Sequence, residues 1–64
     1  MPISPITNKL ERFIKDRNDQ GKYTTLPVLR RFADINKISR KDMGHGIFIL
    51  THTKRVRTNM YGYY

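Results

Sequence analysis

The apolar residues near the start of the chain recur with helical spacing. They are Ile6, Leu10, Phe13 and Ile14. Spacings of four, three and one residues place them on one side of an amphipathic helix. Ser4 and Pro5 precede this stripe, and a serine hydroxyl followed by a proline is typical of a first helical turn. We therefore expect a helix that begins at Ser4-Pro5 and ends in the turn-forming cluster 18–21.

A second helix is predicted over residues 26–35. Thr24 and Thr25 supply hydroxyl groups that can cap its first turn, and Pro27 falls inside that turn, where its missing N–H does little harm. The apolar residues of its buried side are expected to be Val28, Leu29, Phe32, Ala33 and Ile35 or Ile38. The residues expected to face outward are Arg30, Arg31 and Asp34.

The next part of the chain has strand character around two glycines. Residues 43–46, Met-Gly-His-Gly, are a turn-forming cluster, and the segments 37–41 and 47–53 lie on either side of it. The strand interpretation places Ile47 and Ile49 on one face, with Phe48 and Leu50 on the other. The sequence therefore predicts a β-hairpin over residues 37–51.

The last residues, 52–64, permit two interpretations. Val56, Met60 and one of the final tyrosines recur at spacings of three to four, as on a short helix. Asn59 and Gly62 fit an extended tail equally well. The predicted fold class is thus α+β, with two N-terminal helices, a hairpin, and a short C-terminal helix or tail.

The predicted return strand resembles the wing of a winged helix-turn-helix domain. In that family the strand often reads aromatic, any residue, leucine, threonine, and Phe48-Ile49-Leu50-Thr51 matches. The resemblance covers roughly residues 24–60. It implies a DNA-binding domain in which the helix before the wing, here 26–35, is the recognition helix, and residues 40–45 form the wing tip. The chain departs from the family because three helices usually precede the wing and only two are predicted.

This departure leaves two alternatives, a trimmed variant that binds DNA weakly or a protein that uses the same surface to bind another protein. Compact basic chains also resemble accessory proteins of viruses and mobile elements, which often target host transcription machinery. The resemblance therefore also implies an alternative function, a host-protein inhibitor that uses the same basic face against an acidic host protein such as RNA polymerase or a nuclease.

Composition adds a strong positive charge to this picture. The chain has 64 residues, enough for a single domain over 1–64, and 13 Lys and Arg against five Asp and Glu give a net charge of +8. Such a surplus indicates a polyanionic partner, DNA first and RNA or the ribosome as an alternative. The chain has no cysteine, and its longest apolar run is 47–50. We therefore expect a soluble, cytoplasmic protein with no membrane partner, in the host cytoplasm if it is viral.

Charged and polar residues in the predicted helix and hairpin are the candidate contacts to nucleic acid. Arginine can bind phosphate oxygens or guanine edges with two hydrogen bonds, and lysine adds phosphate contacts. The candidates are Thr24, Thr25, Arg30, Arg31, Arg40, Lys41, His45, Lys54, Arg55 and Arg57. Tyr61, Tyr63 and Tyr64 would stack on bases or fold back onto the core, and Tyr23 is expected in the core.

No motif points to catalysis or to a cofactor. A zinc site needs three or four convergent ligands, and the chain offers only His45 and His52 with no cysteine. The five carboxylates show no catalytic pairing, and Gly44-His45-Gly46 lacks the length and the lysine of a phosphate-binding loop. The sequence therefore favours a small DNA-binding transcription regulator, not an enzyme, that docks by helix 26–35 and hairpin 37–51. The sequence does not determine the oligomeric state. A dimer is possible, although no coiled-coil stripe is present.

Overall fold

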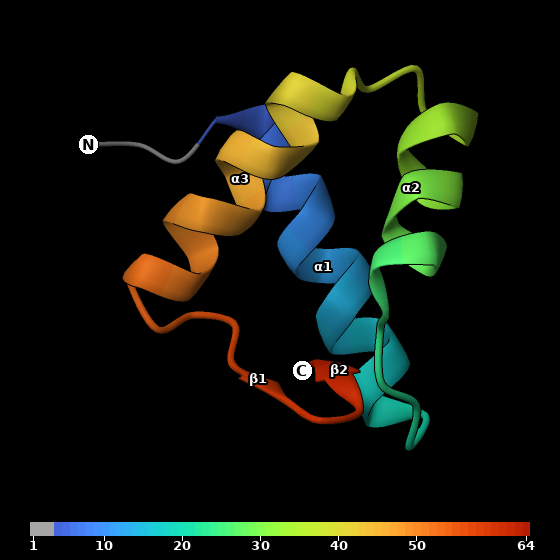
Figure 1. Ribbon diagram of the computed structural model, residues 1–64, viewed down its shortest axis with the longest axis vertical. Helices are drawn as coiled ribbons and strands as arrows, with labels where there is room; N and C mark the ends of the chain where they lie inside the picture. Colours follow the sequence, from blue (N-terminus) through green and yellow to red (C-terminus); the bar gives the residue numbers. More distant parts are fainter. Residues whose placement is uncertain (1–3) are drawn as a thin grey trace.

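The computed structural model describes residues 4–64. The elements, in chain order, are α1 (Pro5–Asp19), α2 (Leu26–Ile35), α3 (Arg40–His52), β1 (Thr58–Asn59) and β2 (Gly62–Tyr63). The two strands form an antiparallel hairpin, in which Thr58 pairs with Tyr63 and Asn59 with Gly62. In Figure 1, α1 lies between α2 and α3, and the hairpin lies at the end of the molecule where α1 finishes. The α+β class is confirmed, but three helices precede the hairpin where two were predicted.

The first two helices form where the sequence predicts them. Ser4 caps α1, because its Oγ accepts a hydrogen bond from the backbone N–H of Thr7 at 3.2 Å. Pro5 and Pro27 each lie in the first turn of their helix. The two helices meet through their apolar sides, where the rings of Phe13 and Phe32 stack at 4.1 Å.

Residues 40–52 form a third helix, so the hairpin predicted over 37–51 is wrong. Ser39 caps this helix by accepting a hydrogen bond from Asp42 N–H at 3.1 Å. The buried residues are Met43, Gly46, Ile47 and Leu50, whose spacings of three, one and three are helical. Phe48 is 63% exposed. The strand interpretation placed Ile47 and Leu50 on opposite faces, but both lie on the buried face of α3.

The two glycines of α3 occupy different environments, which explains why a turn-like sequence is helical. A Cβ at Gly46 would lie 2.7 Å from Leu10 Cδ1 and 3.3 Å from Thr7 Oγ1, so this glycine lets α3 pack closely on α1. A Cβ at Gly44 would have no atom within 4 Å. Burial of the α3 core residues offsets the helix propensity that the glycines lose.

All three helices end with a residue in the left-handed conformation. These residues are Gly21 (φ 76°), Lys37 (φ 57°) and Lys54 (φ 62°). At each end the next backbone N–H bonds back to the helix, as in Ile38 N to Ala33 O at 2.8 Å and Arg55 N to Leu50 O at 2.9 Å. Only the first of these helix ends has the glycine that usually marks one. The end of α2 at Ile35 was predicted from the apolar pattern, and the end of α3 was missed.

The C-terminal segment is neither the helix nor the tail that was predicted. After α3 the chain buries Val56 and then forms the hairpin, whose tip residue Met60 is 88% exposed. Backbone hydrogen bonds join Arg57 and Tyr64 in both directions, at 2.9 and 2.8 Å. Tyr63 packs against the core and also pairs with Thr24, which ties the hairpin to the segment between α1 and α2.

The buried apolar residues form one cluster to which all three helices contribute. They are Leu10, Ile14, Leu29, Ala33, Ile38, Met43, Ile47, Leu50 and Val56. Of the two residues proposed to extend the buried side of α2, Ile38 is in the core and Ile35 is 73% exposed. Within residues 4–64, no helix combines the length and the apolar character that crossing a membrane requires.

Candidate nucleic-acid interface

A short turn sets the direction of α3 relative to α2. Residues 36–39 join the two helices. Lys37 reverses the chain in its left-handed conformation, Ile38 inserts into the core, and Ser39 begins the next helix as its cap. Because the turn is anchored at its buried residue and at both helix ends, the orientation of α3 is fixed by packing and hydrogen bonding.

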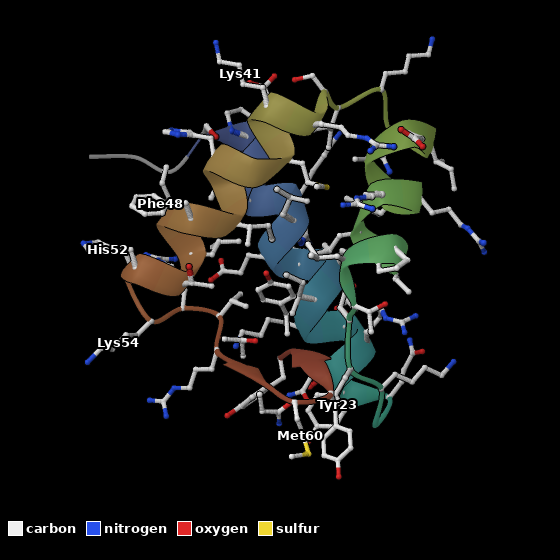
Figure 2. All side chains as sticks on the ribbon, in the orientation of Figure 1. Tyr23, Lys41, Phe48, His52, Lys54 and Met60 are labelled. Carbon is white, nitrogen blue, oxygen red and sulfur yellow. The ribbon has the colours of Figure 1, made fainter. Side chains whose placement is uncertain are left out.

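One side of α3 faces solvent along its whole length. Its exposed residues are Lys41, Gly44, His45, Phe48 and His52, and we call this surface the α3 face. Their spacings of three and four place them opposite the buried residues of the helix. In Figure 2, Lys41, Phe48 and His52 point away from α1 and α2 along one edge of the molecule, and Lys54 continues that edge.

The α3 face combines charge, flat rings and exposed backbone. The rings of Phe48 and His52 stack at 5.5 Å with an angle of 13° between their planes. Gly44 lies one turn from both Lys41 and Phe48, and it contacts nothing that would exclude a side chain. A glycine inside a helix costs about 1 kcal/mol relative to alanine. No contact within the described residues requires a glycine at this position. The missing side chain leaves the backbone of α3 accessible to a binding partner.

The basic side chains beside this face are largely unpaired. Within residues 4–64 one ion pair forms, between Arg55 and Glu11 at 3.6 Å. Lys41, Lys54 and Arg57 are exposed and lack a carboxylate partner in that part of the chain. The edge formed by α3 and the segment that follows it therefore carries a surplus of positive charge, with Asp42 as the one acidic residue of α3.

The structure separates the residues that were predicted to form one binding surface. Arg40, Lys41, His45 and Lys54 belong to α3 or to its end. Arg31 instead lies in a groove between α1 and α2, together with Phe13 and Phe32. The residues 40–45, predicted as a wing tip, are the first turns of α3. The predicted basic surface therefore divides into an α3 part and an α2 part.

Two further candidates at the start of α2 differ in exposure. Thr24 is fully buried, and its Oγ1 accepts a hydrogen bond from Arg17 Nε at 3.2 Å, so its outward placement was wrong. Its position between Arg17 and Tyr63 gives it a structural role. Thr25 is exposed and begins α2 without a side-chain cap hydrogen bond.

The tyrosines gather at the hairpin end of the molecule. Tyr23 was expected in the core but is 40% exposed, and its ring lies 5.5 Å from that of Tyr61 and 5.8 Å from that of Tyr64. Figure 2 shows Tyr23 and the hairpin tip residue Met60 at this end of the molecule. Tyr63 alone of the three final tyrosines packs against the core.

Sequence reasoning placed Gly44 at a wing tip and missed Phe48 and His52 as surface residues. Phe48 was assigned to a strand face and His52 was considered only as a metal ligand. The signal that could have found them is the helical spacing of Lys41, His45, Phe48 and His52, which the turn-like glycines obscured. Among residues 4–64, no three His, Cys, Asp or Glu side chains come together to hold a metal ion.

Comparison with known proteins does not identify this arrangement. No protein-family model matches the chain, and neither a curated protein nor a solved structure is significantly similar to it.

Proposed function

We propose that this protein is a small DNA-binding regulator of the winged helix-turn-helix kind, and that α3 is its recognition helix. The order of elements supports the proposal. The family places three helices before the wing, with the recognition helix last, and here three helices precede the hairpin. The helix predicted as the recognition element, 26–35, becomes the first helix of the helix-turn-helix pair.

The α3 face is the observation that carries the proposal. A helix fits the major groove of B-DNA, which is about 12 Å wide, and an exposed glycine allows its backbone to come close to the bases. Phe48 offers an apolar contact to thymine methyl groups, while Lys41 and the histidines can bind acceptors on base edges or phosphates. Lys54 and Arg57, beyond the end of α3, are placed to bind the flanking phosphates.

Salt dependence of duplex binding tests the proposal. Affinity for a fluorescent DNA duplex would be measured by anisotropy at rising salt, because each neutralised phosphate contributes about 0.9 to the slope of log K against log salt. The double variant Lys41→Ala/Lys54→Ala should lower that slope by about 1.8, since two phosphate contacts are lost. The matched control is Lys9→Ala/Lys15→Ala, which removes the same charge from exposed positions of α1.

Two results would contradict the proposal. An equal decrease in slope for both double variants would mean that positive charge attracts DNA without a defined surface. A wild-type affinity that does not change with salt would exclude DNA as the partner. A competition experiment adds a second criterion. The deep, narrow major groove of A-form RNA excludes a helix. Unlabelled duplex DNA should therefore displace the fluorescent duplex better than double-stranded RNA does.

A further inference from the structure

A second surface lies between α1 and α2, away from the α3 face. It is a groove of about 260 Å³, which we call the α1–α2 groove. The lining residues are Phe13, Arg17, Val28, Arg31, Phe32 and Ile35. Those from α2 recur at spacings of three, one and three, so they form a single stripe along that helix. None of them belongs to the α3 face, whose labelled side chains in Figure 2 point away from both α1 and α2.

The floor and rim of this groove are apolar. Phe13 and Phe32 stack with their planes 21° apart. Ile35, at the C-terminal end of α2, leaves 73% of its surface in solvent, the largest exposure of an apolar side chain on the three helices. An exposed isoleucine beside a half-buried aromatic pair is an incomplete apolar contact, and a partner side chain would complete it.

Two arginines add positive charge to the same groove. Arg17 is held in place, because its Nε donates to Thr24 Oγ1 at 3.2 Å, its Nη2 donates to the carbonyl of Tyr23 at 3.0 Å, and its guanidinium lies 5.9 Å from the centre of the Phe13 ring. These acceptors are neutral, and within residues 4–64 neither Arg17 nor Arg31 pairs with a carboxylate. The groove therefore presents two cations beside an apolar floor, and hydrogen bonds hold the guanidinium of Arg17 in place.

We propose that the α1–α2 groove binds an acidic amphipathic helix of another protein. Apolar side chains of that helix would fill the space between Phe32 and Ile35, and carboxylates beside them would pair with Arg17 and Arg31. This recognition mode suits the shape, because an open groove along a helix accepts an amphipathic partner helix through residues spaced by three and four. The volume, about 260 Å³, is small for a drug-sized ligand but suits one or two inserted side chains.

The inference does not depend on DNA binding. Because the groove and the α3 face share no residues, substitutions in one can be tested without altering the other. If both proposals hold, the protein is an adaptor that brings an acidic protein segment to DNA. If DNA binding fails, the groove still predicts a protein partner of the stated chemistry.

A designed peptide tests the proposal on the full chain. The probe is a synthetic helical peptide of about four turns, with leucines on one stripe and glutamates beside it, and the control is a scrambled peptide of identical composition. Affinity would be measured by fluorescence anisotropy near physiological salt. Arg31→Ala should weaken binding about tenfold, the loss expected for one charge-assisted hydrogen bond. The matched variant Arg30→Ala removes the same charge from a neighbouring position outside the groove, and it should change affinity less than about twofold.

A second variant tests the apolar part of the site. Ile35→Ala should weaken peptide binding while leaving the fold intact, because the side chain is already exposed. Equal losses for Arg31→Ala and Arg30→Ala, or equal affinity for the scrambled peptide, would overturn the proposal, since charge alone would then explain binding. Self-association of the wild-type chain that Ile35→Ala abolishes would also overturn it, because a second copy would then occupy the groove.

Discussion

The packing of α3 on α1 predicts that two alanine substitutions in the same helix have different effects on stability. At Gly44 nothing lies within 4 Å of the new methyl group, and at Gly46 that group would lie 2.7 Å from Leu10 Cδ1. Both substitutions gain the same helix propensity, about 1 kcal/mol. Their difference in stability therefore isolates the contact between the helices.

The cost of a methyl group at Gly46 depends on how little the neighbouring side chains can move. Leu10 is fully buried and Thr7 is 1% exposed, so neither can yield into solvent when a methyl group is added at Gly46. Overpacking of this kind costs about 1–3 kcal/mol, which cancels or exceeds the gain in helix propensity. Gly44→Ala should raise the free energy of unfolding by about 1 kcal/mol, and Gly46→Ala should leave it unchanged or lower it by up to about 2 kcal/mol.

Thermal unfolding followed by circular dichroism measures this difference. For a domain of this size, about 1 kcal/mol shifts the midpoint by roughly 4–8 °C, so Gly44→Ala should melt at least about 4 °C above Gly46→Ala. Equal midpoints, or a higher midpoint for Gly46→Ala, would refute the close contact between the helices. A loss of stability in Gly44→Ala would argue that residue 44 is not in a helix.

Four further predictions concern the helix ends, the core and the α3 face. Lys37→Gly and Lys54→Gly should each stabilise the protein by about 0.5–1 kcal/mol in urea unfolding, because glycine relieves the left-handed conformation; destabilisation would contradict the observed helix ends. Ser39→Ala should cost about 1 kcal/mol in the same assay through the lost cap, whereas an unchanged midpoint would mean that the cap is not formed. Leu50→Ala should cost about 2–5 kcal/mol, a large part of the stability of so small a domain, and a cost below about 1 kcal/mol would show that Leu50 is not in the core. Phe48→Ala should change stability by less than about 0.5 kcal/mol but weaken DNA binding with an unaltered salt slope, and unchanged affinity would remove Phe48 from the interface.

The sequence predicted α1 and α2, because their start signals lie within the helices themselves or directly before them. Ser4 and Pro5 mark the start of α1, and Pro27 lies in the first turn of α2. The third helix was missed because its glycines resemble a turn. The close approach that Gly46 permits depends on Thr7 and Leu10 of α1, which lie more than 30 residues earlier in the chain. Tertiary packing overrode local propensity here.

The wrong hairpin prediction also assigned the candidate binding residues to the wrong elements. With residues 40–45 taken as a wing tip, Phe48 and Leu50 shared a strand face, although in the helix one is exposed and the other buried. Lys54 stops α3 without a glycine, so the hairpin beyond it could not be located from turn residues alone. The positive charge was predictable from composition, but its division between the α3 face and the α1–α2 groove depends on how the helices pack.

The most direct test of the α3 face as the DNA-binding surface is a titration of the isotope-labelled protein with duplex DNA, followed by amide chemical shifts in NMR spectra. If the α3 face binds DNA, the largest changes map to the exposed residues of α3 and to Lys54, while Phe32 and Ile35 in the α1–α2 groove stay nearly unchanged. Changes concentrated in the groove, or spread evenly over all helices, would contradict it.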